Sequence, residues 1–230
     1  MRGPIWLAVV AACGGSDAPS GPTARFALPG SGVPAPLAVP FPSDIYRDAD
    51  GTLVEGLTDW SLAGLDEPEP SAMLSQYGAL DGFGVQSGIV FGVDGLDGTD
   101  TVDPATLTAD RFVLIDVDAG APVPCGVGYD AFAHAIVLVP DDVLVPGKRY
   151  AAGMLAGPAV AAGQELAASA GFLAVRDDDA APVYGDAIGA LVDHGGVDRG
   201  QLIAATGYTT STDSHGAFDT AARLYAGAYG

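Results

Sequence analysis

A cysteine near the N-terminus is the residue of this sequence whose type and spacing point most clearly to chemistry. The run Val10-Ala11-Ala12-Cys13 places two small residues directly before Cys13. The apolar stretch 5–12 is far shorter than the ~20 residues that span a bilayer, and one positive charge precedes it, as in a secretory signal peptide. We therefore predict that residues 1–12 are a lipoprotein signal peptide and that the Cys13 thiol carries lipid. Because the positively charged segment at the start holds only two residues, Met1 and Arg2, a stray apolar N-terminus with an ordinary cysteine is the alternative.

The side chains of a hydrolytic triad occur in the sequence, but their spacing does not predict a triad. Asp213, Ser214 and His215 are direct neighbours, and neighbouring residues cannot converge as a folded triad does. The Gly-x-Ser-x-Gly pattern of a nucleophile elbow does not occur. His134 alternates with apolar residues along an expected strand. His194 stands at the expected C-terminal end of a helix, where its side chain can interact favourably with the helix dipole. We predict no catalytic residue in this chain.

Acidic loops raise the question of calcium. Within the segment 46–57, Asp48, Asp50 and Gly51 are spaced as in an EF-hand loop, but the carboxylates of its first and twelfth positions are missing. The Asp- and Gly-rich loop 94–100 has a better composition for a calcium ion, although such clusters usually form turns. Three scattered histidines and one spare cysteine show no zinc-ligand spacing. We predict no metal and no cofactor, with calcium in the loop 94–100 as the alternative.

Composition narrows the classes of partner. The 230 residues include 9 Lys and Arg against 29 Asp and Glu, for a net charge of −20. A field of this sign repels nucleic acid and anionic lipid headgroups, so we predict no nucleic-acid partner. Cations, basic proteins or plain solvation of an acidic surface fit the charge. Cys125 is the only cysteine besides Cys13, so no intramolecular disulfide is expected if Cys13 carries lipid, and the packed core must supply the stability.

The pattern along the chain predicts a mainly β fold after a linker. Residues 13–36 have the Gly, Ser, Pro and Ala composition of a flexible linker. From residue 37 to 178, short apolar runs alternate with turn signals, which is typical of a β-sandwich. The predicted strands are residues 89–93, 112–117, 131–139, 150–155 and 172–175, and a short helix is predicted at 71–80.

The sequence changes character after the acidic run 177–179. Residues 182–194 predict a helix, because Pro182 suits a first helical turn and Gly195 suits the position after the last one. A last strand is predicted from residues 201–205 and 208–210, and a second helix from 217–228. We therefore separate residues 179–230 from the sandwich as a helix–strand–helix extension.

Five short motifs occur in the same order as in a known bacterial family. Together they span about residues 37–212 and resemble the N-terminal Ig-like region of bacterial secreted lipase-like lipoproteins, the virulence-factor lipase N-terminal domain. The motifs are Phe41-Pro42-Ser43-Asp44, Leu80-Asp81-Gly82-Phe83, Asp103-Pro104-Ala105-Thr106-Leu107, Leu144-Val145-Pro146-Gly147-Lys148-Arg149-Tyr150 and Tyr208-Thr209-Thr210.

The resemblance implies an Ig-like β-sandwich. It also implies that an α/β-hydrolase domain bearing the catalytic residues follows this region, so the extension 179–230 leads towards a downstream domain that is absent from this chain. The motifs have physical interpretations of their own as well. Pro146 and Gly147 favour a turn before Tyr150, which is placed like the tyrosine that anchors sandwich folds. We expect Tyr150 to be buried, with its hydroxyl bonded to backbone near that turn.

These observations predict a lipid-anchored Ig-like module of the cell envelope with a non-catalytic spacer, adhesion or accessory role. Its partners are then the membrane, through the lipid on Cys13, and an unidentified surface or protein. The glycine after Cys13 favours the outer membrane or the cell surface, by resemblance to known lipoprotein sorting. The alternative is the N-terminal portion of a longer secreted lipase or esterase, which is a hydrolase only if a downstream domain exists.

Overall fold

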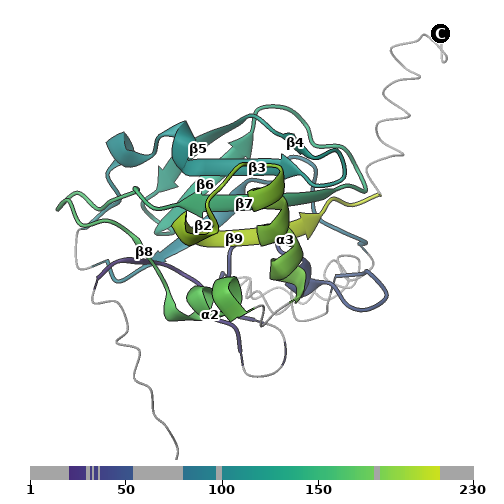
Figure 1. Cartoon of the computed structure of the whole chain (residues 1–230), viewed down its shortest axis with the longest axis horizontal. Helices are drawn as coiled ribbons and strands as arrows, with labels where there is room; N and C mark the ends of the chain where they lie inside the picture. The colour runs from purple at the N-terminus through teal and green to yellow at the C-terminus, as the bar shows by residue number, and fades with distance from the viewer. Residues whose placement is uncertain are drawn as a thin grey trace, which may run out of the picture.

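Two β-sheets face each other in the computed structural model, which describes residues 21–29, 32, 34–35, 37–53, 80–96, 100–178 and 182–212. The strands of one sheet follow the order β5-β6-β2-β1-β8, and those of the other follow β4-β3-β7-β9 (Figure 1). The prediction of a mainly β, two-sheet fold is confirmed. The strands are β1 (Thr23–Ala24), β2 (Ile89–Asp94), β3 (Phe112–Asp116), β4 (Ala121–Pro122), β5 (Cys125–Asp130), β6 (Ala135–Pro140), β7 (Arg149–Leu155), β8 (Ala167–Ala168) and β9 (Leu202–Thr209). The helices are α2 (Ala170–Asp178) and α3 (Pro182–Asp193), and the short 3-10 turns are η1 (Asp44–Tyr46), η3 (Pro104–Thr106), η4 (Ala109–Arg111) and η5 (Arg199–Gln201).

The five-stranded sheet is built on the alternation of apolar residues in β2 and β6. Ile89 and Phe91 of β2 are buried, and their cross-strand partners on β6 are Leu138 and Ile136, which are buried too. Because alternate side chains of a strand point to opposite faces, these residues line the face that packs against the other sheet. The strand β1 adds to β2 in antiparallel fashion and pairs with β8 in parallel.

The four-stranded sheet is covered on both faces. Every residue of β7 after Arg149 is buried. Tyr150 of β7 stacks on its cross-strand partner Tyr208 of β9, with ring centroids 5.8 Å apart. On the other face, a Cβ atom placed on Gly153 would lie 2.9 Å from a methyl group of Leu191 in α3. Small residues on that face of the sheet therefore let α3 pack closely against it.

The helix α3 lies across β7 and β9 (Figure 1). Its buried residues Tyr184, Ala187, Ile188 and Leu191 follow the spacing of one helix face. The predicted helix 182–194 is thus observed as Pro182–Asp193. Among the described residues, no helix is both long enough and apolar enough to cross a bilayer.

The prediction of a strand at 172–175 is wrong, because these residues lie in α2. A short apolar run does not by itself distinguish a strand from a buried helix. Phe172 and Val175 are three residues apart on one buried helix face. The hydroxyl of Ser169 accepts the backbone N–H of Phe172 at 3.3 Å and so satisfies one of the free donors of the first turn.

The predicted strand 131–139 begins later than expected. Residues 131–134 form the turn between β5 and β6, and His134 has a φ of +47° there. His134 and Phe132 are therefore exposed, not on the apolar face of a strand. The preceding strand β5 was not predicted at all, because glycines alternate with its apolar residues.

The structure draws the domain boundaries differently from the prediction. Thr23–Ala24 falls inside the predicted linker 13–36 but forms β1, and nearby Phe26 is buried. At the other end, β9 pairs with β7 over its whole length and α3 packs on both, so this part of 179–230 belongs to the sandwich and not to an extension. The predicted helices 71–80 and 217–228 lie outside the described residues, apart from Leu80 itself.

Candidate functional site

A shallow groove of about 390 Å³ lies where β6 leads into the loop 141–147. We call it the β6 groove. It is lined by Gln86, Val139, Pro140, Asp141, Asp142 and Val143. Val139, Val143 and nearby Val145 keep between 41% and 52% of their surface exposed. Three of the four exposed large apolar side chains among the described residues therefore gather at this end of the sandwich. Apolar surface that is grouped in this way marks an interaction site more often than scattered single residues do.

The loop beside the groove is anchored through Val145. The backbone N–H of Val145 donates to the Tyr150 hydroxyl at 3.0 Å, and the Thr210 hydroxyl donates to the Val145 carbonyl oxygen at 2.7 Å. With both of its backbone groups bonded, Val145 has a fixed backbone while its side chain projects into solvent.

Leu144 explains why the two valines beside it point outwards. Its side chain is buried, and its N–H donates to the carbonyl oxygen of Val85 at 2.9 Å. Because side chains alternate along extended backbone, burial of Leu144 directs Val143 and Val145 to the opposite side. The apolar surface is therefore presented by a preorganised loop. The alternation of Val143, Leu144 and Val145 is the sequence signal that could have identified this surface.

The expectation for Tyr150 is confirmed. Its side chain is buried, and its hydroxyl is bonded to backbone at the turn that precedes β7. Burial raises the pKa of Tyr150 above the ordinary tyrosine value. Its position anchors the loop of the groove to the core, so the motif 144–150 is a structural element here.

The groove lies in a negative field. Asp141 and Asp142 are exposed at its wall, and the sequence contains a single lysine, Lys148. Burial and the charge of Asp141 both raise the pKa of the Cys125 thiol, which disfavours the reactive thiolate. The surface therefore combines aliphatic contacts with acidic groups and favours a cationic, apolar ligand.

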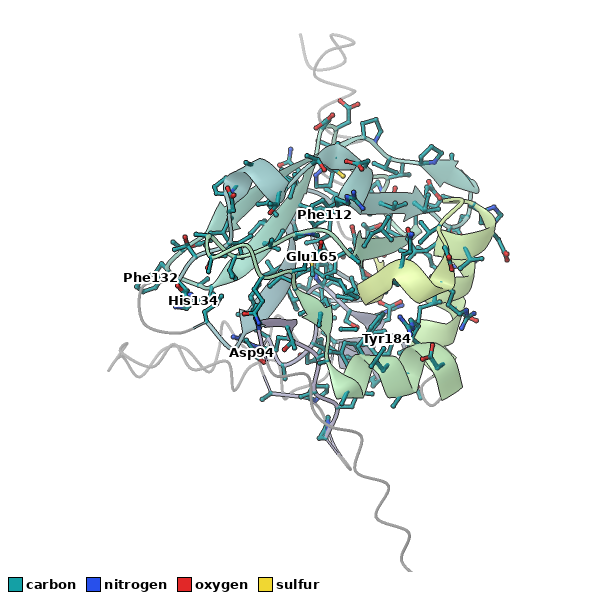
Figure 2. All side chains as sticks on the ribbon, turned by 60° about the vertical axis from the view of Figure 1, so that its left-hand side comes forward. Asp94, Phe112, Phe132, His134, Glu165 and Tyr184 are labelled. Carbon is teal, nitrogen blue, oxygen red and sulfur yellow. The ribbon has the colours of Figure 1, made fainter. Side chains whose placement is uncertain are left out.

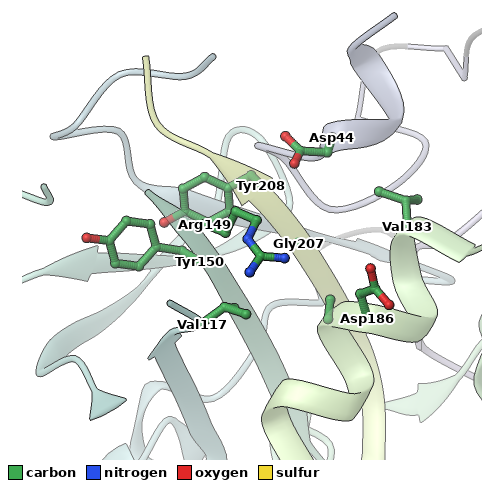
Figure 3. Close-up of a pocket in the computed structure, with 9 residues that line it drawn as sticks. Asp44, Val117, Arg149, Tyr150, Val183, Asp186, Gly207 and Tyr208 are labelled. Carbon is green, nitrogen blue, oxygen red and sulfur yellow. The ribbon is translucent and has the colours of Figure 1, made fainter. Parts of the chain in front are cut away.

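A second, smaller pocket of about 80 Å³ lies between α3 and the ends of β7 and β9 (Figure 3). Asp44 is held there by the N–H and the hydroxyl of Thr209, at 2.8 and 2.7 Å. Arg149 bonds to Asp118 at 2.8 and 2.9 Å. Ligand pockets usually measure about 300–1,000 Å³, so this pocket is too small for a substrate of ordinary size. Asp44 thus ties η1 to β9, and Arg149 ties the turn after β3 to β7.

The two histidines that the structure describes lie on separate elements. His134 is in the β5–β6 turn, where its ring nitrogen lies 3.4 Å from the Tyr129 hydroxyl. His194 follows α3 and lies against Gly120. The structure therefore does not bring them together. The predicted lipid-attachment residue Cys13 and the cluster 213–215 lie outside the described residues.

In the acidic loops considered for calcium, the carboxylates of Asp48 and Asp94 bind other groups of the protein. The Asp48 carboxylate accepts the N–H groups of Asp50 and Thr52 and the Thr52 hydroxyl, each at 3.0 Å, as the first residue of a tight turn does. Asp94 forms an ion pair with Arg25 at 2.7 Å. Residues 97–99 of the other loop lie outside the described part. Within the described ranges, no three His, Cys, Asp or Glu side chains lie close enough together to hold a metal ion.

No protein-family model matches the chain, and no curated protein matches it either. Among solved structures, the crystal structure of the S-layer protein rSbsC matches with a TM-score of 0.29 and 18% sequence identity. The match covers 42% of this chain and 14% of that chain. At this TM-score the likeness carries no inference about function.

Proposed function

We propose that this chain is a lipid-anchored, non-catalytic module of the cell envelope with an Ig-like sandwich, held at the outer membrane or cell surface through Cys13. Its role is to dock a basic, apolar segment of another protein in the β6 groove, which is an adhesion or accessory function.

The preorganised apolar surface of the β6 groove carries this proposal. Val143 and Val145 stay exposed because the loop that holds them is bonded to Tyr150 of β7, to Thr210 directly after β9 and to Val85. A loop fixed before binding loses little conformational entropy when a partner docks. The carboxylates of Asp141 and Asp142, and a net charge of −20, complement lysine or arginine side chains and repel a second copy of the same chain.

Titration of the full chain with a peptide of alternating leucine and lysine tests the docking surface. We expect Val143→Ser, which leaves the net charge unchanged, to weaken binding about tenfold, because it removes one apolar contact. Ala161→Ser changes another exposed residue, which does not line the groove, and should bind as the parent does. If both variants bind equally well, the peptide is held by general charge attraction and the groove is not the site.

The anchor is tested separately in cells. Cys13→Ala removes the thiol that would carry lipid, so the protein should move from the membrane fraction to the soluble fraction, whereas Cys125→Ala should leave it with the membranes. A Cys13→Ala variant that stays with the membranes as the parent does would exclude lipid anchoring.

The alternative proposal is the N-terminal portion of a longer secreted lipase or esterase. Four of the five motifs shared with that family contact one another around the end of β9. Phe83 pairs with Thr210, Asp44 bonds to Thr209, and Thr210 bonds to Val145. These contacts brace the point from which the chain continues beyond residue 212. A Gly-x-Ser-x-Gly elbow encoded after Gly230 would favour this alternative, as would ester turnover by the full chain that one serine substitution abolishes.

A further inference from the structure

Phe132 is the most exposed large apolar side chain among the described residues, with 98% of its surface accessible. It lies at the tip of the β5–β6 hairpin, between Ala131 and Ala133, so the three residues of the tip carry no charge. Figure 2 shows Phe132 and His134 projecting at one side of the molecule. Transfer of this ring from water into another apolar phase would be favourable.

The hairpin tip is fixed in this position by its backbone. One carboxylate oxygen of Asp130 accepts the N–H groups of Phe132 and Ala133, at 2.9 and 3.1 Å. The carbonyl oxygen of His134 accepts the N–H of Val93 at 2.8 Å, which ties the turn to β2. The Asp130 carboxylate is thus engaged at the base of the turn, and the ring of Phe132 points away from the sheet.

The first described strand begins at the same end of the sheet as this tip. Thr23 of β1 pairs with Asp94, and Gly92 pairs with Ala135, the residue that follows the turn. Nine residues lie between Cys13 and Thr23, so these two residues can be at most about 35 Å apart. A lipid on Cys13 therefore holds the end of the sheet that carries Phe132 close to the bilayer.

A tether of this length changes what a single aromatic side chain can do. One phenylalanine is too weak to recruit a protein to a membrane, but a lipid attached only a few residues away gives an effective concentration in the millimolar range. The net charge of −20 opposes contact with anionic headgroups. The surface that this tip fits is therefore an uncharged or zwitterionic one.

We propose that residues 131–133 insert the Phe132 ring into the headgroup layer of a zwitterionic membrane and so orient the sandwich on the surface that anchors it. The proposal rests on the lipid anchor at Cys13. In this orientation the β6 groove, at the opposite end of β6, faces away from the membrane and is accessible to a partner.

Quenching of tryptophan fluorescence by brominated phosphatidylcholine tests this contact. The lipidated full chain is reconstituted in such vesicles as the parent, as Phe132→Trp and as Ala119→Trp, and the parent emission is subtracted. Ala119 is an exposed residue of the β3–β4 turn, which Asp118 bonds to Arg149 at the start of β7, the strand that is linked to the loop of the β6 groove through Tyr150. We expect the Phe132→Trp signal to be quenched at least about twofold more than the Ala119→Trp signal, and less so when phosphatidylglycerol replaces a third of the lipid.

The outcomes separate the two proposals. If the parent does not float with the vesicles, the lipid anchor is absent, and the proposed membrane contact of Phe132, which rests on it, is refuted as well. If the parent floats but the two variants are quenched equally, the anchor stands, the membrane contact is refuted, and Phe132 is left as a surface for a protein. Quenching that grows with the anionic fraction would refute the zwitterionic preference.

Discussion

Two stacked tyrosines in the core offer a matched pair of substitutions. Tyr150 and Tyr208 are cross-strand neighbours, and both side chains are buried. The Tyr150 hydroxyl accepts the Val145 N–H at 3.0 Å, whereas the Tyr208 hydroxyl has no hydrogen-bond partner among the described residues. Tyr150→Phe and Tyr208→Phe each remove one oxygen atom and keep the ring. The two substitutions should nevertheless change the free energy of unfolding in opposite directions.

The magnitudes follow from what each hydroxyl does. Tyr150→Phe loses a hydrogen bond and leaves the Val145 N–H partly buried without its acceptor, so it should lower the free energy of unfolding by about 1–2 kcal/mol. In Tyr208→Phe a polar atom that is buried without a partner disappears, so stability should be unchanged or rise by up to about 1 kcal/mol. Tyr150→Ala, which also empties the ring site, should cost about 3–5 kcal/mol.

Urea denaturation followed by circular dichroism measures these changes. If the slope of the unfolding free energy against urea is unchanged, a shift of the midpoint is a change in stability. We expect the midpoint of Tyr150→Phe to fall and that of Tyr208→Phe to hold or rise. Equal losses in both variants would refute the reasoning, because they would mean that the Tyr208 hydroxyl is bonded to a partner such as a buried water.

Two further predictions concern packing and pH. Gly207→Ala would place a Cβ atom 2.8 Å from the Ala187 Cβ of α3, so it should lower the free energy of unfolding by about 1–3 kcal/mol. Gly189→Ala meets no atom outside its own helix within 4 Å and should raise the free energy of unfolding by up to about 1 kcal/mol. Equal effects of the two variants in thermal unfolding would contradict close packing of α3. Burial raises the pKa of Tyr46 to about 12, against about 10 in an unfolded chain. The unfolded chain therefore releases this proton first, so stability should be constant up to about pH 10 and fall towards pH 12, which phenolate absorbance and unfolding curves at each pH can check.

The features that the sequence predicted correctly depend on local patterns. Alternation of apolar residues predicted β2, β3 and β7, and a buried helical face with Pro182 at its start predicted α3. The environment of Tyr150 was predicted from turn chemistry, since Pro146 and Gly147 determine where the chain turns before β7. Each of these inferences needed only neighbours along the chain.

What the tertiary structure alone decided depends on contacts between distant segments. The apolar run at Phe172 fits a strand or a helix equally well, and its helical state is decided by its cap and by packing of Phe172 against Phe26, with ring centroids 5.4 Å apart. The strand β5 is hidden in the sequence by its glycines and exists because β6 pairs with all of it. The exposure of Val143 and Phe132 follows from bonds that hold Leu144 and the hairpin turn to β2 and the segment before it. Hydrophobicity alone predicts burial for all of these residues, and only the placement of their neighbours determines which of them stay in water.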